Sequence, residues 1–383
     1  MKAAAALVVG DVGPEEAAVR LALDVREPVA VSDLAVVFVS NHYWAHAAEF
    51  LHTLTQVLGP VPLIGCVAES VLGNGQEVED QAAAALWLAS GLGEVETFAV
   101  EHIATASGGL FAGHRFEPGG GPYVVLADPF EFPVGDLLSH VNEHVPGALL
   151  MGGLASGGGD RRASKLFLGD QVLTSGAVVA SLSGAVVDLV VSQGCRPIGN
   201  PFTVTRSSGN VVHEMGGRPP FQRLQDLVAT LPETDRNLLA DGGLQVGQAI
   251  DEYRHEQKRG DFLVHSVVGA DPATGSMVVA APVEVGQTLQ FHVRDAASAD
   301  EDLRQALQEE VMELGGEEPG AVLLFTCNGR GLRLFSEPDH DAALVTKILG
   351  SVPVIGAFCA GELGPVGGGN FLHNFSACLA VFR

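Results

Sequence analysis

The fold is decided by residues 33–75, which read DLAVVFVSNHYWAHAAEFLHTLTQVLGPVPLIGCVAESVLGNG. A short apolar run rich in β-branched residues opens this stretch, and a second one, PLIGC, comes near its end. Between them, Phe50, Leu51, Leu54 and Leu58 recur at roughly the spacing of one helix face. Apolar runs on either side of a helical period are typical of two strands joined by a helix. The stretch therefore predicts a β-α-β unit.

The same order of features occurs twice more along the chain. Residues 320–369 open with GAVLLFTCNGRG and close with VPVIGAFCAGELGPVGGG, and residues 123–159 form a looser copy. Each of the three stretches is followed by a further apolar run: AAAALWLAS, SGAVVASLSG and SACLAVF. Added strands of this kind favour mixed sheets over purely parallel ones. We predict an α/β fold with an α+β tendency, made of two related halves built on β-α-β units, with helices packed on the sheets.

Breaker residues indicate how the chain is divided. The sequence GGRPP at residues 216–220 separates an apolar block from a helical one. We expect an N-terminal extension at 1–30, a first domain at 31–217 and a second domain at 218–383. Within the second domain, residues 251–295 alternate like antiparallel strands, and residues 298–315 predict a helix with Ser298 as its N-cap.

The charge of the chain argues against two classes of partner. There are 46 acidic and 21 basic residues, which give a net charge of −25. Nucleic acid binding needs clustered Lys and Arg, and an anionic membrane surface would repel so acidic a protein. No apolar run is long enough to span a bilayer. We expect no nucleic acid partner and no membrane association.

The cysteines indicate a reducing compartment. Five of them are scattered singly, and no C-x-x-C pair occurs, so a zinc knuckle or a redox dithiol has no support. We therefore predict a cytoplasmic protein with no metal and no cofactor.

Two short motifs carry candidate chemistry. CNGRG at residues 327–331 follows a predicted strand, so Arg330 could hold a carboxylate in two parallel hydrogen bonds, or could simply be a solvated arginine in a tight turn. A C-x-x-E spacing follows two matching strands, ending at Glu69 and at Glu362. Such a carboxylate could receive an ammonium group or could cap turn amides. PDHD at residues 338–341, at the start of a predicted helix, is interpreted as an N-cap cluster.

Taken together, the ordered motifs resemble the FIST family (F-box and intracellular signal transduction). The motifs are PLIGCVAESVLG, GGLASGGG, SQGCRPIGNPFTVTRSSGNVV, FHVRDAASADEDL, LLFTCNGRG, PDHD and VPVIGAFCAGELGPVGGGNFLHNFSACLA. They extend from about residue 31 to residue 382. The resemblance implies a sensory module that binds small ligands such as amino acids, and it brings no catalytic mechanism with it. No kinase, cyclase, receptor or F-box segment accompanies these motifs, which leaves the output of any signal open.

Three functions follow from these observations. The first is a sensor in which Arg330 or Arg294 holds a ligand carboxylate and Glu362 holds an amine. The second is an enzyme with Cys327 or Cys359 as nucleophile and His373 as the candidate base, because a catalytic thiol needs a base. The third is a scaffold that binds another protein and no metabolite. The partners expected beside a small ligand are a signalling protein or a second copy of the chain in a homo-oligomer. The candidate ligand-binding residues are Arg196, Arg294, Cys327, Arg330, Gly331, Cys359, Glu362, Asn370 and His373.

Overall fold

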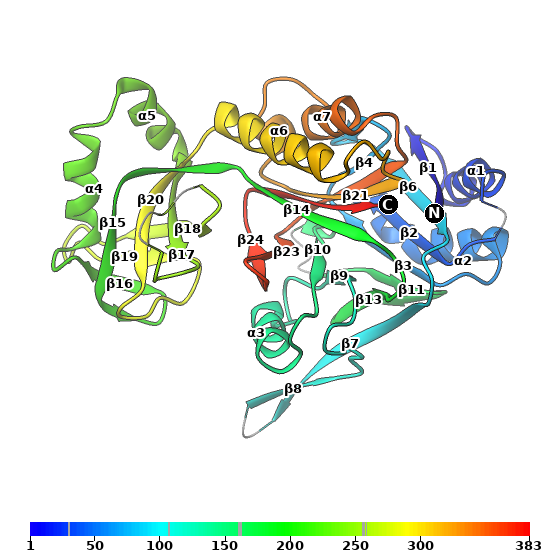
Figure 1. Ribbon diagram of the computed structural model, residues 1–383, viewed down its shortest axis with the longest axis horizontal. Helices are drawn as coiled ribbons and strands as arrows, with labels where there is room; N and C mark the ends of the chain where they lie inside the picture. Colours follow the sequence, from blue (N-terminus) through cyan, green and yellow to red (C-terminus); the bar gives the residue numbers. More distant parts are fainter. Residues whose placement is uncertain (30, 106–107, 160–162, 255–256, 258) are drawn as a thin grey trace. The chain divides into compact units, whose positions relative to one another are not determined.

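A computed structural model describes residues 1–29, 31–105, 108–159, 163–254, 257 and 259–383. Residue 30, where the predicted N-terminal extension ends, lies outside the described residues. The chain divides into two compact units (Figure 1). Unit 1 contains Met1–Val191, Leu303–Leu372 and Ser376–Arg383, and unit 2 contains Ser192–Asp302 and His373–Phe375. Unit 2 is therefore an insertion in the sequence of unit 1.

Unit 1 contains three β-α-β units in three mixed sheets, which confirms the predicted fold class. In each, two strands pair in parallel and a helix connects them. A later strand pairs antiparallel with the first strand of each unit, as the added apolar runs predicted. The first unit consists of β2 (Leu34–Ser40), α2 (Ala47–Leu58) and β3 (Leu63–Ala68), and its added strand is β6 (Ala83–Ser90). The second unit consists of β9 (Tyr123–Ala127), α3 (Val134–His144) and β10 (Leu150–Leu154), and its added strand is β13 (Ala177–Leu182). The third unit consists of β21 (Ala321–Cys327), α7 (His340–Leu349) and β22 (Val354–Cys359), and its added strand is β25 (Ser376–Phe382).

After each β-α-β unit, a short hairpin leaves its own sheet and completes another one. The hairpins are β4 (Val71–Gly73) with β5 (Gln76–Val78), β11 (Leu166–Leu168) with β12 (Gln171–Leu173), and β23 (Glu362–Val366) with β24 (Gly369–His373). They pair with β22, β3 and β10, respectively. The first hairpin thus joins the third sheet, the second joins the first sheet, and the third joins the second sheet.

Three equivalent hydrogen bonds mark this cyclic exchange. In each sheet, a backbone N–H of the second parallel strand donates to the carbonyl of the residue just before the incoming hairpin. The pairs are Phe358 to Ser70 (3.0 Å), Val67 to Lys165 (2.9 Å) and Leu154 to Gly361 (2.9 Å). Because every sheet needs a strand from another repeat, the three repeats depend on one another for their hydrogen bonding.

Each sheet also has an additional strand beside its antiparallel strand. These strands are β1 (Lys2–Val9), β7 (Val95–Thr105), which pairs with β8 (Gly108–Ala112), and β14 (Val187–Gln193). Helix α1 (Pro14–Arg26) packs with α2 on one face of the first sheet, α3 covers the second sheet, and α6 (Ala296–Glu313) and α7 contribute to the core of the third (Figure 1). The inner faces of all three sheets share one apolar core, in which the rings of Phe38 and Phe325 meet edge to face at 6.0 Å.

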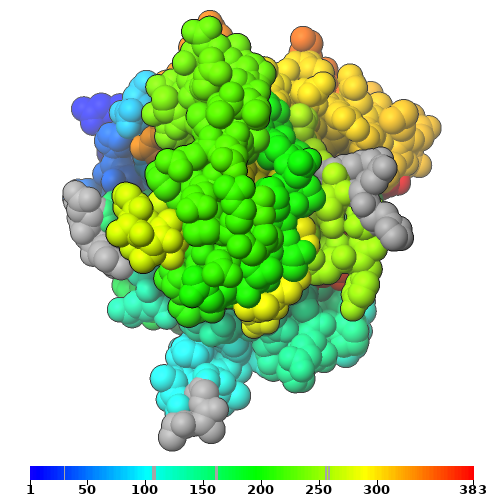
Figure 2. Space-filling view, turned by 90° about the vertical axis from the view of Figure 1, so that its left-hand side faces the viewer, coloured from blue at the N-terminus to red at the C-terminus, as the bar shows by residue number. Residues whose placement is uncertain are grey.

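Unit 2 is a closed antiparallel barrel around a separate apolar core that includes Val246 and Phe291. The predicted antiparallel strands within residues 251–295 are confirmed here. Its green segment, which contains α4 and α5, forms a continuous surface in the space-filling view (Figure 2). In order around the barrel, the strands are β15 (Cys195–Ser208), β16 (Val211–Met215), β19 (Met277–Val279), β18 (Phe262–Ala270), β17 (Leu244–Ala249) and β20 (Thr288–Arg294), and the helices are α4 (Pro220–Val228) and α5 (Glu233–Leu238).

Two predicted helix starts are corrected by the structure. Helix α6 begins at Ala296, before Ser298, because Asp295 accepts hydrogen bonds from the backbone N–H of Ala297 (3.2 Å) and from the Ser298 hydroxyl (2.6 Å). Helix α7 begins at His340, and the side chain of its N-cap residue, Asp339, makes no capping hydrogen bond. The carboxylate that caps α7 comes from another repeat, as described below.

The predicted boundary between residues 217 and 218 lies between β16 and α4, inside unit 2. It stays a prediction about sequence domains, because compact units and sequence domains need not coincide. Among the described residues, no helix is long and apolar enough to cross a membrane.

Candidate ligand site at the ends of two parallel strands

The CNGRG turn lies where the parallel strands β21 and β22 end side by side. Cys327 and Cys359 are direct neighbours in this ladder, and the N–H of Asn328 donates to the Cys359 carbonyl (2.9 Å). Gly331 has a φ of 56°, and a Cβ there would lie 2.8 Å from the Phe358 ring. Only glycine fits this position without strain. The turn is therefore held tightly at the carboxyl edge of the sheet, where α/β folds commonly bind ligands.

Arg330 is fully buried, so its interpretation as a solvated turn residue is wrong. Its Nε and Nη2 donate to the two oxygens of Asp341 at 2.6 and 2.7 Å. The Thr326 hydroxyl also donates to Asp341 (2.7 Å). Burial by itself lowers the pKa of Arg330, but the Asp341 charge raises this pKa by more. Burial by itself raises the pKa of Asp341, but Arg330 holds that pKa well below its ordinary range. The pair is therefore ionised at neutral pH, and its geometry fixes the guanidinium plane.

The hairpin that comes from the first repeat supports this pair. Glu77 on β5 accepts hydrogen bonds from the backbone N–H groups of Asp341 (2.9 Å) and Ala342 (3.0 Å), so it caps the N-terminus of α7. Its own N–H donates to Asp339 Oδ1 (2.6 Å). Burial, and then the nearby Asp341 charge, raise the pKa of Glu77 to about 8. The exchanged hairpin thus joins the first repeat to the helix that carries Asp341.

Glu362 opens β23 and is fully buried. Its Oε2 accepts hydrogen bonds from the hydroxyl (2.7 Å) and the backbone N–H (3.3 Å) of Ser376. Burial raises the pKa of Glu362 to about 8, although the Ser376 hydrogen bonds, the Arg330 charge and the Cys327 thiol act in the opposite direction. At pH 7 most Glu362 side chains are therefore protonated. Arg330 and Cys327 influence this carboxyl group, so all three share one electrostatic environment.

Three buried polar atoms in this region have no hydrogen-bond partner within the described part of the chain: Asn328 Oδ1, Arg330 Nη1 and Glu362 Oε1. Buried polar atoms in native proteins nearly always have a partner, which can be water or a ligand. Here a cationic donor, an amide acceptor and a carboxyl oxygen remain available. They come from the turn after β21 and from the residue that begins β23.

The cysteines near this region are buried. Burial, and then Glu362, raise the pKa of Cys359 well above its ordinary value, and burial does the same to Cys378. A nucleophilic cysteine needs a lowered pKa. Cys359 is therefore poorly suited to the nucleophile role. Cys327 is also buried, and its Sγ accepts a hydrogen bond from the Gly329 N–H (3.4 Å).

Asn370 has a structural environment. Its Oδ1 accepts a hydrogen bond from the Leu150 N–H (2.7 Å), and its Nδ2 donates to Asn142 Oδ1 and to the Ala148 carbonyl, both at 2.9 Å. Both polar atoms of the side chain therefore have protein partners. These bonds anchor the third hairpin to the second repeat. A ligand role for Asn370 stays a prediction.

The remaining candidates belong to unit 2. Arg196 forms ion pairs with Asp235 (2.6 Å) and Asp295 (3.1 Å). The guanidinium of Arg294 lies 5.4 Å from the centre of the Phe375 ring. His373 is buried near His265, whose pKa is lowered to about 4 by burial and then by His373. The sequence candidates thus form two groups, with Cys327, Arg330, Gly331, Cys359, Glu362 and Asn370 in unit 1 and Arg196, Arg294 and His373 in unit 2.

Sequence reasoning missed the residues that set the environment of this site: Asp341, Glu77, Ser376 and Asn328. The sequence places Asp341 in a cap cluster and Ser376 in an apolar strand. Neither pattern reveals which side chain each residue contacts in the folded protein. Among the described residues, no group of three or more His, Cys, Asp or Glu side chains could hold a metal ion.

Comparisons with known proteins agree with the sequence motifs. The model of the FIST N domain matches residues 33–218, and the model of the FIST C domain matches residues 220–365. An uncharacterised protein of Mycobacterium bovis is 44% identical over 370 residues, which cover 96% of this chain and 95% of the relative. An uncharacterised protein of Mycobacterium tuberculosis is 44% identical over 369 residues, which cover 96% of each chain.

Proposed function

Because the chain belongs to the FIST family, whose domains are sensory domains of signal transduction, we propose that it senses a small amino-acid-like metabolite at the strand-end site of unit 1. The observation that supports this proposal is a set of three buried polar atoms that have no partner among the described residues: Arg330 Nη1, Asn328 Oδ1 and Glu362 Oε1. They provide one cationic donor and two acceptors, which is the complement of a molecule with both a carboxylate and an ammonium group.

Each charged group of the ligand has a defined partner in the proposed site. Asp341 occupies Nε and Nη2 of Arg330, so Nη1 is already oriented when a ligand carboxylate arrives. The ligand ammonium donates to Glu362 Oε1 and Asn328 Oδ1. Preorganised polar groups of this kind cost little ordering entropy on binding. Cys327, Gly331 and Cys359 form the wall of the site in this proposal.

Binding is coupled to a proton in this proposal. Glu362 is mostly protonated at pH 7 without ligand, because burial raises its pKa to about 8. An ammonium group beside it favours the carboxylate and lowers its pKa. Ligand binding near pH 7 therefore releases a proton, and Glu362 acts as the part of the site that recognises positive charge.

Other roles complete the proposal. Separate ligand-binding roles for Arg196, Arg294, Asn370 and His373 stay predictions, and a cytoplasmic location is inferred from the absence of disulfides among the five cysteines. The sequence domains 31–217 and 218–383 stay predictions. A signalling partner or a homo-oligomer would carry the output.

A thermal unfolding screen against amino acids and related metabolites tests the proposal. A ligand at 100 times its Kd stabilises the native state by about 2.7 kcal/mol. We expect at least one zwitterionic metabolite to raise the Tm of the wild type and to lose this effect in Glu362→Gln. The control is Glu69→Gln, which makes the same change at the other C-x-x-E glutamate, in the first repeat, and should leave the ligand effect intact. Absence of any stabilising metabolite, or full stabilisation of Glu362→Gln, would refute the proposal.

A further inference from the structure

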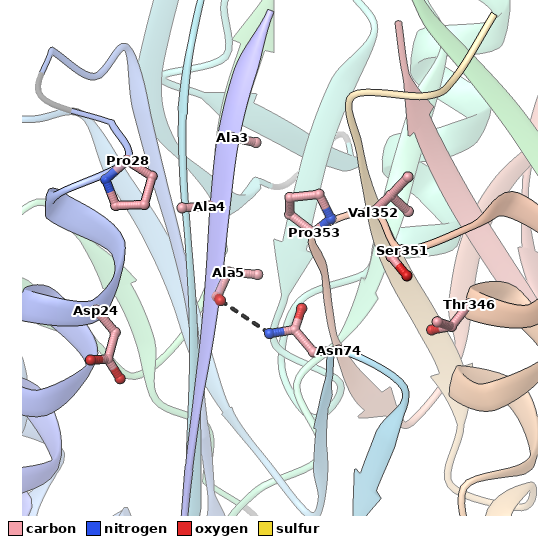
Figure 3. Close-up of a pocket in the computed structure, with 10 residues that line it drawn as sticks. All are labelled: Ala3, Ala4, Ala5, Asp24, Pro28, Asn74, Thr346, Ser351, Val352 and Pro353. Carbon is pink, nitrogen blue, oxygen red and sulfur yellow. Dashed lines mark hydrogen bonds between the residues drawn. The ribbon is translucent and has the colours of Figure 1, made fainter.

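Strand β1 is an edge strand whose free side borders a groove in unit 1. It is the outermost strand of its sheet and, among the described strands, pairs only with β6. A groove of about 430 Å³ runs beside it. Figure 3 shows Ala3, Ala4 and Ala5 along the strand, with Asp24 and Pro28 on one side and the segment 351–353 on the other. Long accessible edges are usually blocked, because they accept other strands.

The register of β1 shows which backbone groups face the groove. Gly10, opposite Ala82, donates its N–H to the Ala82 carbonyl (2.9 Å), so even-numbered residues of β1 direct their polar groups to β6. Odd-numbered residues therefore direct theirs outward. Consistent with this, Asn74 Nδ2 donates to the Ala5 carbonyl (3.1 Å) (Figure 3). Within the described residues, the Ala3 N–H, the Ala3 carbonyl and the Ala5 N–H have no hydrogen-bond partner.

Asn74 also ends the open part of the edge. Its backbone N–H donates to the Val354 carbonyl (2.8 Å), and its Oδ1 accepts from the Val354 N–H (3.4 Å). Asn74 therefore fills the space between β1 and β22 at Ala5. The edge stays open only toward Ala3, where small side chains and Pro353 leave room for one more extended chain.

We propose that this groove binds an extended, basic peptide segment of a partner protein, which adds to β1 as a further strand. An extended backbone supplies the donor and acceptor spacing that the Ala3 and Ala5 groups require. The only charged side chain that lines the groove is Asp24, which makes no ion pair in the described part of the chain. The whole chain carries a net charge of −25. Both charges favour Lys or Arg in the segment.

The side-chain pattern of the segment follows from the faces of the sheet. Ala4 packs toward α1, whereas Ala3 and Ala5 pack toward the shared core. Side chains of an added strand alternate between the same two faces. Every second residue of the segment therefore points to the face of the sheet that α1 covers. Because Asp24 lies on that face, we expect these residues to be Lys or Arg. The others point toward Thr346 and Ser351 and are small or polar.

A second copy of this chain is a poor occupant. Its own β1 lies between the same two walls, so two such edges cannot reach the spacing of about 4.8 Å that paired strands need. Two copies would also bring together two strongly acidic proteins. The groove therefore suits a single thin chain better than another sheet.

Hydrogen exchange in the full-length protein labelled with [15N]alanine tests the proposal. The probe is a capped octapeptide of alternating lysine and serine. With it, exchange of the Ala3 and Ala5 amides should slow at least threefold, while the Ala4 and Ala6 amides, which already face β6, stay unchanged. Two singly N-methylated versions of the peptide, methylated at adjacent central amides, should differ at least tenfold in Kd, because only one methyl group blocks the ladder.

Variants separate groove binding from general attraction to an acidic protein. Asp24→Lys should weaken peptide binding about threefold. Glu143→Lys changes an exposed residue of α3 by the same charge and should have a smaller effect. Equal Kd values for the two methylated peptides, unchanged Ala3 and Ala5 exchange, or no binding would overturn the proposal. So would protection of Ala3 and Ala5 that rises with protein concentration alone, because a second copy would then occupy the edge.

Discussion

Glu69 and Glu362 both end a C-x-x-E motif, yet they lie at different places in their repeats and in different environments. Glu69 comes two residues before the hairpin of β4 and β5, whereas Glu362 opens the hairpin of β23 and β24. Each ends a C-x-x-E motif after the second parallel strand of its β-α-β unit. Glu362 is fully buried, hydrogen-bonded to Ser376 and has a pKa raised to about 8. Glu69 is half-buried and forms an ion pair with the exposed Arg333. The shared spacing therefore does not fix the position of the carboxyl group, and the elements packed around each glutamate decide its charge.

The two arginines of the turn after β21 show the same contrast. Arg330 is enclosed with Asp341, and Arg333, three residues later, pairs with Glu69 at the surface. A buried charge left without its partner costs far more than an exposed one, because it cannot be solvated. The difference between these neighbouring pairs can therefore be measured directly.

The largest effect is expected from Arg330→Ala. It leaves Asp341 buried without its partner, so the free energy of unfolding should fall by about 3–5 kcal/mol. Urea unfolding followed by circular dichroism measures this change. A loss below 1 kcal/mol would show that the buried pair does not hold the turn.

Replacement of Glu362 should change how stability depends on pH. Its native pKa of about 8 lies above its ordinary value of 4.5, so the native state binds more protons than the unfolded chain between these values. Its contribution is therefore present below about pH 4.5 and is lost as pH rises toward 8. Glu362→Gln should flatten this fall by about 3 kcal/mol between about pH 5 and pH 8, because one pKa unit corresponds to about 1.4 kcal/mol. Urea unfolding at pH 5 and pH 8 checks it, and Glu69→Gln should leave the fall as in the wild type.

Glu77→Gln tests the link between the first and third repeats. The amide keeps one oxygen that can accept from the start of α7, so the loss should be about 1–2 kcal/mol, in the range for weakened buried hydrogen bonds. Differential scanning calorimetry would report it as a lower Tm. Glu49→Gln, at an exposed site on α2, serves as the control. An unchanged Tm in Glu77→Gln would contradict the role of Glu77 as a cap.

The smallest effect is expected from Arg333→Ala. Exposed ion pairs contribute about 0–1 kcal/mol, because water solvates both partners when they separate. The same urea measurement should therefore show a change of less than 1 kcal/mol, and 1 M salt should reduce the difference further. A loss as large as that of Arg330→Ala would remove the distinction between the two pairs.

Much of the fold could be predicted because its strands and helices follow from the local pattern of apolar residues. Apolar runs beside a helical period, as in residues 33–75, reveal a β-α-β unit without knowledge of the rest of the chain. The hairpin exchange could not be predicted in this way. Strands such as β4 and β11 have only three residues each, and their partners lie in other repeats. Partner choice over such distances depends on the packing of the whole unit.

The position of the CNGRG turn was predictable, but its environment was not. CNGRG after a strand correctly indicated a glycine turn at a sheet edge, and Gly331 is required there by its φ of 56°. The partners of Arg330 and Glu362 lie 11 and 14 residues away on other elements, so no motif could show them. The cap of α7 lies 264 residues from Asp341 in sequence. Burial and charge arise only when these elements pack together.

The most direct test of the central claim is calorimetric titration of the best stabilising amino acid into the wild type and Glu362→Gln at pH 7. Titrations in two buffers with different ionisation enthalpies give the number of protons released on binding. The account predicts release of close to one proton by the wild type and much weaker binding without that release by Glu362→Gln. Equal affinity and equal proton release in both proteins would contradict it, as would the absence of binding to the wild type.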